Sequence, residues 1–208
     1  MGVLKTFFQG PESKTEAFLT RAGPVAGARG FYSYPGPPLA EAGRAALVAL
    51  FKRLRGAPVA HVYASDARAE TEAARLAALI LGVPYTLDPR LRDRAWGDWE
   101  GVPFARVREA NPELVRRWAE DEAGFRPPGG ESVLDVWARS QPLLRALLDR
   151  HRGAGFLLVG NCTVNRALLA LALPFLPPEA GLRLEQDEAR LTHLVFYDDV
   201  GVIKALNR

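Results

Sequence analysis

Short apolar runs alternate along the chain with longer stretches in which apolar residues recur at helical spacing. Gly155–Gly160 (GFLLVG) is apolar throughout, as expected of a strand buried on both faces, and Glu41–Arg55 carries a helical pattern that ends near Gly56. The same criteria predict strands at 17–20, 58–64, 83–87, 155–160, 191–197 and 202–206, and helices at 41–55, 66–81, 131–150 and 162–173. This alternation predicts an α/β fold, a three-layer sandwich whose mainly parallel central sheet is flanked by helices.

Local signals refine these boundaries. Ser65 is expected to cap the helix at 66–81 and Gly82 to end it. The segment 198–201 contains Gly201 and is expected to form the hairpin turn between the last two strands. The stretch 103–122 looks helical but lies outside the simple alternation. We therefore expect one domain over residues 15–208, with a helical insert near 103–122.

The first 14 residues differ in character from the rest. Leu4–Glu12 (LKTFFQGPE) resembles a viral protease cleavage site of the kind built into expression tags. Residues 1–14 are therefore interpreted either as a native N-terminal extension or as the remnant of a tag.

The composition is that of a globular chain. The 208 residues, 48% of them hydrophobic and 25% charged, are enough for one domain with a full core. No apolar run approaches the roughly 20 residues that a membrane helix needs. The N-terminus also lacks a basic segment followed by an apolar one, so we expect a cytoplasmic protein with no membrane association.

Cysteine and histidine are too scarce for the usual metal centres. Cys162 is the single cysteine, which excludes an internal disulfide and a cysteine-based zinc cluster. His61, His151 and His193 lie far apart in the sequence, and each is expected to have a structural role. No metal site and no cofactor are therefore expected.

The charge pattern gives little information about partners. The formal net charge is only +3, and no basic run with interleaved aromatic residues occurs. This pattern does not favour nucleic-acid binding and indicates an anionic ligand only weakly. The oligomeric state stays open.

Three loops that follow predicted strands define a candidate site. They are Arg21–Gly23, Ser65–Arg68 and Asn161–Thr163. In open α/β sheets ligands bind beyond the carboxyl ends of the strands, where these loops are expected to meet.

Six short motifs lie in order over residues 16–208. They read RAG (21–23), PLAEAGR (38–44), ASDA (64–67) followed by Arg68, LRDRAWGDWEG (91–101), PGGES (128–132) and VGNCTVNR (159–166). Their order and spacing resemble those of the histidine phosphatase (phosphoglycerate mutase-like) superfamily. The resemblance implies a phosphoglycerate mutase-like sandwich.

The resemblance also implies a set of catalytic positions. In that family one histidine attacks phosphorus, two arginines and a second histidine neutralise the phosphoryl oxygens, and a glutamate protonates the leaving oxygen. Carried over by motif, the nucleophile position is Ala22, the second histidine position is Asn161 and the acid position is Asp93. Arg21 is kept.

The second arginine position depends on the alignment. Without a gap it is Ala69, and a shift of one residue would bring in Arg68. On a helix such a shift turns the side chain by about 100°.

We therefore expect a non-catalytic relative that binds an anionic or phosphorylated small molecule. The candidate ligand-binding residues are Arg21, Arg68, Asp93, Asn161, Cys162 and Thr163. Two alternatives are an active phosphomonoester hydrolase with an unusual site and a protein-interaction module that uses the insert.

Cys162 is the candidate nucleophile of the first alternative, because it lies at a predicted helix N-terminus, where a thiolate is stabilised. Cysteine phosphatases, however, have an arginine six residues further on, and here that residue is Leu168. The other interpretation is a small buried cysteine that packs beneath the helix.

Aromatic residues near these motifs allow two interpretations. Trp96 and Trp99 either line a pocket or pack the insert against the core. Tyr32 and Tyr34 either cover a ligand or anchor their own loop.

Overall fold

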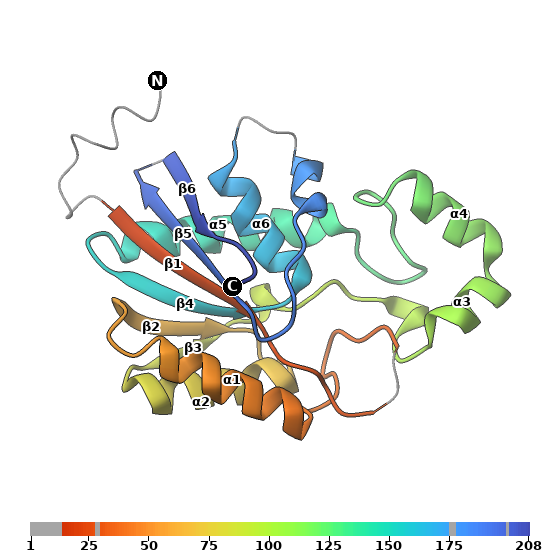
Figure 1. Ribbon diagram of the computed structural model, residues 1–208. Coiled ribbons are helices and arrows are strands. Elements are labelled where there is room, and N and C mark those ends of the chain that lie inside the picture. Colours follow the sequence, from red (N-terminus) through yellow and green to blue (C-terminus); the bar gives the residue numbers. More distant parts are fainter. Residues whose placement is uncertain (1–13, 28–29, 175–177, 199) are drawn as a thin grey trace.

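The computed structural model describes residues 14–27, 30–174, 178–198 and 200–208. Within this part of the chain, six strands form one sheet in the order β3-β2-β4-β1-β5-β6 (Figure 1). The inner pairs β2–β4 and β4–β1 and the edge pair β2–β3 are parallel, whereas β5 and β6 are antiparallel to their neighbours. The strands are β1 (Lys14–Arg21), β2 (Val59–Ala64), β3 (Tyr85–Leu87), β4 (Gly155–Gly160), β5 (Leu191–Tyr197) and β6 (Val200–Ala205).

Helices cover both faces of the sheet, so the predicted three-layer sandwich is confirmed. Figure 1 shows helices both below and above the sheet. The lower pair is α1 (Glu41–Arg53) and α2 (Arg68–Leu81), and the upper pair is α5 (Val133–Arg150) and α6 (Cys162–Ala172). Each layer has its own apolar core, one built around Phe51 and Leu47 and the other around Phe156 and Leu168.

The register of the central strands aligns their carboxyl ends. Arg21, the last residue of β1, pairs with Gly160 at the end of β4, and Ala64 at the end of β2 pairs with Val159. The loops that leave these three strands therefore start at the same edge of the sheet. Parallel strands flank β4 on both edges and the helix layers cover both of its faces, so the strand is buried completely, which explains its continuous apolar sequence.

Some element boundaries differ from the predicted ones. The helix expected at 66–81 begins at Arg68, because the Ser65 hydroxyl accepts a hydrogen bond from the Ala67 backbone N–H (3.3 Å) in a turn before the helix. The helix expected from residue 131 begins at Val133. There Ser132 and Asp135 form a reciprocal capping box, in which each side chain bonds the other residue's backbone N–H.

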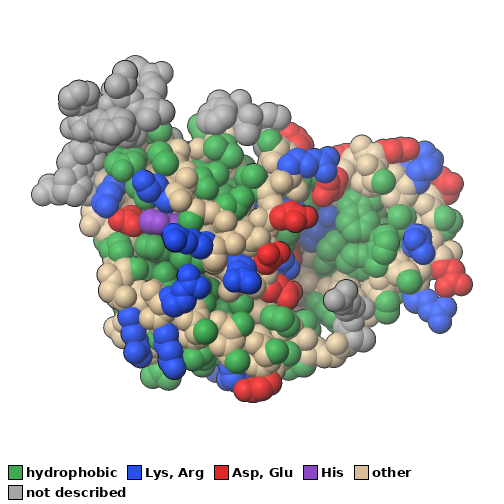
Figure 2. All heavy atoms as spheres, in the orientation of Figure 1, with side chains coloured by type: hydrophobic (Ala, Val, Ile, Leu, Met, Phe, Trp, Pro, Cys, Tyr) green, Lys and Arg blue, Asp and Glu red, His purple; other side chains and the backbone are tan. Residues whose placement is uncertain are grey.

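Two short helices occupy the stretch expected to be an insert. They are α3 (Phe104–Ala110) and α4 (Pro112–Glu120), and they lie beside the sandwich rather than on the sheet (Figure 1). Figure 2 shows hydrophobic side chains gathered on this part of the surface, next to a hollow between it and the sheet. An aromatic cluster packs the helices together; its members include Phe31, Trp96, Trp99, Phe104, Trp118 and Phe125.

The extension or tag remnant was expected at residues 1–14. Residues 1–13 lie outside the described residues, and Lys14 is the first residue of β1. Among the described residues, no helix is both long enough and apolar enough to span a bilayer.

Candidate ligand pocket

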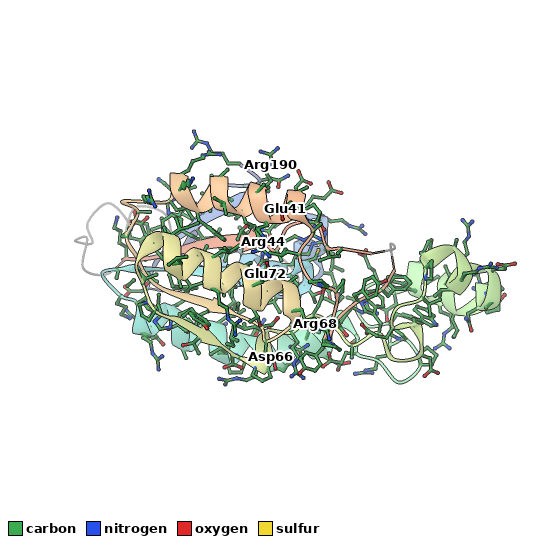
Figure 3. The ribbon with its side chains drawn as sticks, turned by 90° about the horizontal axis from the view of Figure 1, so that it is seen from below. Glu41, Arg44, Asp66, Arg68, Glu72 and Arg190 are labelled. Carbon is green, nitrogen blue, oxygen red and sulfur yellow. The ribbon has the colours of Figure 1, made fainter. Side chains whose placement is uncertain are left out.

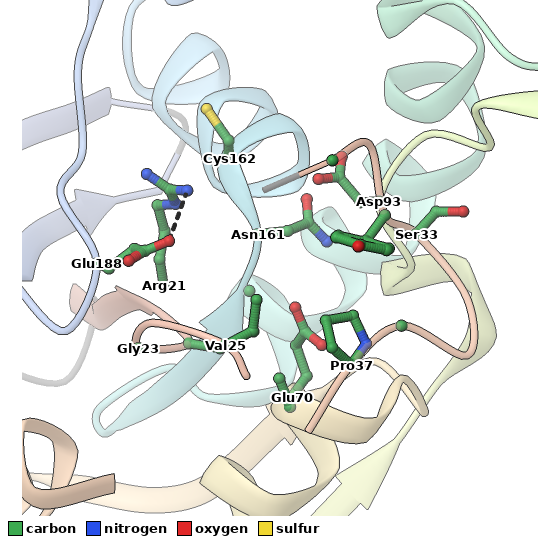
Figure 4. Close-up of a pocket in the computed structure, with 16 residues that line it drawn as sticks. Arg21, Gly23, Val25, Ser33, Pro37, Glu70, Asp93, Asn161, Cys162 and Glu188 are labelled. Atoms are coloured by element: carbon green, nitrogen blue, oxygen red, sulfur yellow. Dashed lines mark ion pairs between the residues drawn. The ribbon is translucent and has the colours of Figure 1, made fainter. Parts of the chain in front are cut away.

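A cavity of about 210 Å³ opens at the carboxyl ends of β1 and β4 (Figure 4). It lies where the loops after β1 and β4 meet the first turn of α2 and the loop before α1. Its lining consists of Arg21, Ala22, Gly23, Val25, Gly30, Tyr32, Ser33, Gly36, Pro37, Ala69, Glu70, Asp93, Gly160, Asn161, Cys162 and Glu188. Most of the residues that the motifs single out therefore lie around one cavity.

Arg21 supplies the one guanidinium group among the described residues of this lining. Its Nη1 donates a hydrogen bond of 2.7 Å to the backbone oxygen of Gln186, and its Nη2 lies 3.7 Å from a carboxylate oxygen of Glu188. Figure 4 draws this ion pair at one end of the cavity, near Cys162. Part of the guanidinium is thus already bound by the protein.

Ala22 lies directly after Arg21 and presents only a methyl group. Its backbone N–H donates to the Gly160 oxygen (3.3 Å), which ties the first loop to the end of β4. The next residue, Gly23, packs against Gly43 of α1 so closely that a Cβ would lie 2.7 Å from the Gly43 Cα. Glycine at both positions therefore lets the loop approach α1 and fixes Ala22 at the cavity.

Asn161 faces the cavity, but its side chain stabilises the local structure. It is the N-cap residue of α6, and its Oδ1 accepts a hydrogen bond from the Val164 N–H (2.9 Å). Its Nδ2 donates to the backbone oxygen of Leu91 (2.9 Å). Both polar atoms of this amide therefore have protein partners, and they hold the α6 terminus against the segment that carries Asp93.

Asp93 lies across the cavity from Arg21. Its Oδ1 accepts a hydrogen bond of 2.8 Å from the Arg94 backbone N–H, and the Thr163 hydroxyl is a further hydrogen-bond partner. Burial raises the pKa of Asp93, although these hydrogen bonds act in the opposite direction. Thr163 itself is buried and does not appear in the cavity wall.

The first turn of α2 decides between the two alignments of the second arginine. Ala69 and Glu70 line the cavity, whereas Arg68 is exposed and does not. Figure 3 places Arg68 at the start of α2, near Asp66. The ungapped alignment, in which Ala69 takes the arginine position, is therefore the one that agrees with this geometry, and the structure does not bring Arg68 to the site.

Glu70 is a pocket residue that the sequence analysis missed. Burial raises its pKa to about 7, helped by the nearby charge of Asp93 and opposed by its own backbone N–H and by Arg21. Perturbed pKa values of this size concentrate at functional sites. Glu188 was missed as well, because it comes from a loop about 170 residues after Arg21 and only the fold brings the two together.

Cys162 does line the cavity, as the first residue of α6. Burial raises the pKa of its thiol, and this effect outweighs the opposing influence of Arg166 and Arg21. The thiol is therefore protonated near neutral pH, which argues against a cysteine nucleophile.

The three histidines all lie away from this cavity. His61 bonds Thr86 (2.9 Å), His151 bonds the buried Tyr63 hydroxyl (3.0 Å), and His193 pairs with Glu16 (2.9 Å). Among the described residues, no group of three or more histidine, cysteine, aspartate or glutamate side chains is placed to hold a metal ion.

The aromatic candidates divide between the two interpretations. Trp99 is buried in the aromatic cluster and Trp96 packs against it, so the packing interpretation agrees with the structure. Tyr32 lines the cavity, whereas Tyr34 is exposed and stacks on the Arg92 guanidinium at 3.6 Å. Tyr34 also lines a second, separate hollow, whose wall shares Ser33 and Asp93 with that of the first cavity.

The fold and the position of the cavity define a class: an α/β sandwich with a ligand pocket at the carboxyl ends of its parallel strands. A sequence profile of the Histidine phosphatase superfamily (branch 1) matches residues 17–208. The chain therefore belongs to the histidine phosphatase superfamily, as its motifs predict.

Curated relatives agree with this family but match only in part. The chain is 36% identical over 145 residues to a bifunctional protein of Mycobacterium tuberculosis, a match that covers 68% of this chain and 38% of that protein. It is also 36% identical over 110 residues to a glucosyl-3-phosphoglycerate phosphatase of the same organism, covering 53% of this chain and 49% of the relative. The matched segments thus span less than half of each relative.

Solved structures confirm the phosphoglycerate mutase-like fold over nearly the whole chain. The mycobacterial glucosyl-3-phosphoglycerate phosphatase in complex with VO3 superposes with a TM-score of 0.81 at 28% identity, covering 92% of this chain and 98% of that one. Bacillus stearothermophilus YhfR superposes with a TM-score of 0.83 at 26% identity, covering 92% and 96%.

Proposed function

We propose that this protein is a non-catalytic member of the histidine phosphatase superfamily that binds a small phosphorylated molecule at Arg21. One observation carries the proposal: Ala22 and Asn161 line the cavity beside Arg21, at the positions where the family resemblance places the two catalytic histidines. Alanine has no lone pair with which to attack phosphorus. The Asn161 amide has no charge, and protein groups already occupy its polar atoms.

The loss of the nucleophile and of the second arginine matters more for catalysis than the acidic group that is retained. Loss of a nucleophile alone costs on the order of 10³- to 10⁶-fold in rate. Ala69 lines the same cavity in the position of the second arginine, so the charge that would stabilise the transferring phosphoryl group is reduced as well. Asp93 retains an acidic group, but an acid without a nucleophile does not complete the reaction.

Arg21 is the group that supports phosphate binding. A guanidinium forms charge-assisted hydrogen bonds with phosphate oxygens, and these are stronger than neutral ones. The related mycobacterial phosphatase has been solved with inorganic phosphate and with VO3. Because Glu188 and the Gln186 oxygen already engage Arg21, we expect weak, millimolar binding of inorganic phosphate.

Two measurements test the proposal. Hydrolysis of p-nitrophenyl phosphate by the wild type should not exceed that of the Cys162→Ala and Asp93→Asn variants. Millimolar phosphate should raise the melting temperature, and Arg21→Ala should abolish this rise. Arg68→Ala is the matched control, since Arg68 lies outside the cavity wall, and it should leave the rise unchanged.

Turnover clearly above that of the two variants would overturn the non-catalytic assignment. A phosphate-induced rise in melting temperature that persists in Arg21→Ala would overturn the assignment of the binding group.

A further inference from the structure

The balance of charge in the cavity differs from that of an ordinary phosphate site. A phosphate dianion is best held by several cationic or N–H donor groups. Among the described residues, Arg21 is the one cationic side chain in the wall, and three carboxyl groups lie around the same space, those of Glu70, Asp93 and Glu188. Glu188 pairs with Arg21, but Glu70 and Asp93 belong to the other side of the cavity (Figure 4).

Among the described residues, Glu70 is the member of this set that has no hydrogen bond or ion pair with another side chain, although the charge of Arg21 influences it through space. It stands in the first turn of α2, and its side chain points from the helix toward Asn161 (Figure 4). Within the described residues, the hydrogen bond assigned to its carboxylate is with its own backbone N–H. A mostly buried carboxylate without a cation or a side-chain donor is costly for a protein to keep.

The neighbouring Glu72 shows what a structural glutamate on this helix looks like. Its carboxylate pairs with Arg44 of α1, and this ion pair connects the two helices (Figure 3). Glu70, two residues earlier, faces the cavity instead. Among the described residues no arginine or lysine forms a hydrogen bond or an ion pair with it, and the charge of Arg21 lowers its pKa only through space. Asp93, which raises the pKa of Glu70 through its charge, adds a second carboxyl group to the same end.

The size of the cavity limits the ligand. About 210 Å³ is less than the 300 Å³ or so at which pockets for drug-sized ligands begin. A ligand of this size that contacts Arg21 also lies close to Glu70 and Asp93. It therefore needs an anionic group at one end and a cationic or donor group at the other.

We propose that the cavity selects a small zwitterionic phosphoester, whose phosphoryl group lies at Arg21 and whose ammonium group lies between the carboxylates of Glu70 and Asp93. This inference rests on the proposed function, since it names the class of ligand for the same pocket. Glu70 is then the specificity-determining residue. The ammonium group supplies the counter-charge that the described residues do not provide at this end of the cavity.

Two probes of nearly equal size test the selection. Phosphoethanolamine carries a phosphoryl and an ammonium group, and 2-hydroxyethyl phosphate carries a neutral hydroxyl in place of the ammonium. Titration calorimetry on the full chain at pH 8 should give at least about tenfold tighter binding of phosphoethanolamine. In Glu70→Gln this ratio should fall close to one, while binding of 2-hydroxyethyl phosphate is retained or strengthened.

Glu113→Gln is the matched control, because Glu113 is exposed on α4, outside the cavity. It should leave the ratio of the two affinities unchanged.

The pH dependence of the same ratio in the wild type is a second test, and it needs no variant. Glu70 faces Arg21, Asp93 and the Cys162 thiol in the cavity, and with its pKa raised to about 7 it gains a proton between pH 8 and pH 6. The wild-type ratio should therefore shrink over this range, while titration of the phosphoryl group is common to both probes and cancels.

The outcomes separate this inference from the proposed function. Equal affinity for the two probes at pH 8 overturns the selection for an ammonium group but leaves phosphoester binding at Arg21 intact. Failure of both probes and of inorganic phosphate to bind overturns both proposals. If the preference for phosphoethanolamine persists in Glu70→Gln and at pH 6, another group binds the ammonium, and the role of Glu70 is refuted.

Discussion

Replacing Glu70 by glutamine is expected to stabilise the protein at alkaline pH and to leave it nearly unchanged in acid. Burial raises the pKa of Glu70 in the folded state from its usual 4.5 to about 7. Between these values the folded protein holds a proton that the unfolded chain has released. The free energy of unfolding therefore falls as pH rises from about 4.5 to about 7 and is constant above that. Glutamine does not titrate, so the variant lacks this loss.

The size of the effect follows from the same values. Each pKa unit between the folded and unfolded states corresponds to about 1.36 kcal/mol, so the full rise corresponds to roughly 3 kcal/mol. Part of the loss has already occurred at pH 5, because the unfolded glutamate is mostly ionised there. Between pH 5 and pH 8 the stability of Glu70→Gln relative to the wild type should thus increase by roughly 2 to 3 kcal/mol.

Urea denaturation of both proteins at pH 5 and pH 8 measures this difference directly. Asp93 is present in both proteins, so the part of its titration that does not depend on Glu70 cancels, and its coupling to the Glu70 charge is included in the measured difference. Glu113→Gln, on the exposed face of α4, should differ from the wild type by less than about 0.5 kcal/mol at either pH. If the relative stability of Glu70→Gln also stays within about 0.5 kcal/mol across this range, the Glu70 carboxylate is well solvated and the reasoning is refuted.

Two further predictions concern the phosphate end of the cavity. A triple variant, Ala22→His, Ala69→Arg and Asn161→His, restores the chemical groups of the family at these positions. It should show measurable hydrolysis of p-nitrophenyl phosphate or a trapped phosphohistidine, and detection of either supports the assignment of the positions. Glu188→Gln removes the carboxylate that lies 3.7 Å from Arg21. Calorimetry should therefore show about three- to tenfold tighter binding of inorganic phosphate to this variant. Weaker binding would mean that Glu188 positions Arg21 rather than competing with the ligand.

The sequence predicts the sandwich well because its strongest signals are local. The apolar run of β4 and the helical pattern of α1 each depend on burial of their own residues, and both elements begin at the predicted residue. Boundaries set by single polar residues were predicted less well. Ser65 has the side chain of a helix cap, yet its hydroxyl bonds within a turn, and α2 begins three residues later.

The site was predictable only where a motif fixes the position of a residue on a strand end. Arg21, Ala22 and Asn161 lie in the cavity as expected because the register of β1 and β4 aligns their loops. Arg68 does not line the cavity, because one residue on a helix changes the side-chain direction by about 100° and the start of α2 was predicted two residues too early. Thr163 supports the site from behind the cavity wall through Asp93.

Glu70 bears on whether the pocket has simply decayed. If the site had only lost its chemistry, neutral or apolar side chains would fill it at little cost, as Ala22 and Ala69 do. An unpartnered carboxylate in the same wall instead costs roughly 3 kcal/mol at neutral and alkaline pH, a large fraction of the stability of a typical domain. Strain of this kind without a structural partner is characteristic of functional sites. The retained Arg21 and the acidic end one residue beyond Ala69 therefore support the proposal of a pocket adapted to binding rather than one that has only lost its chemistry.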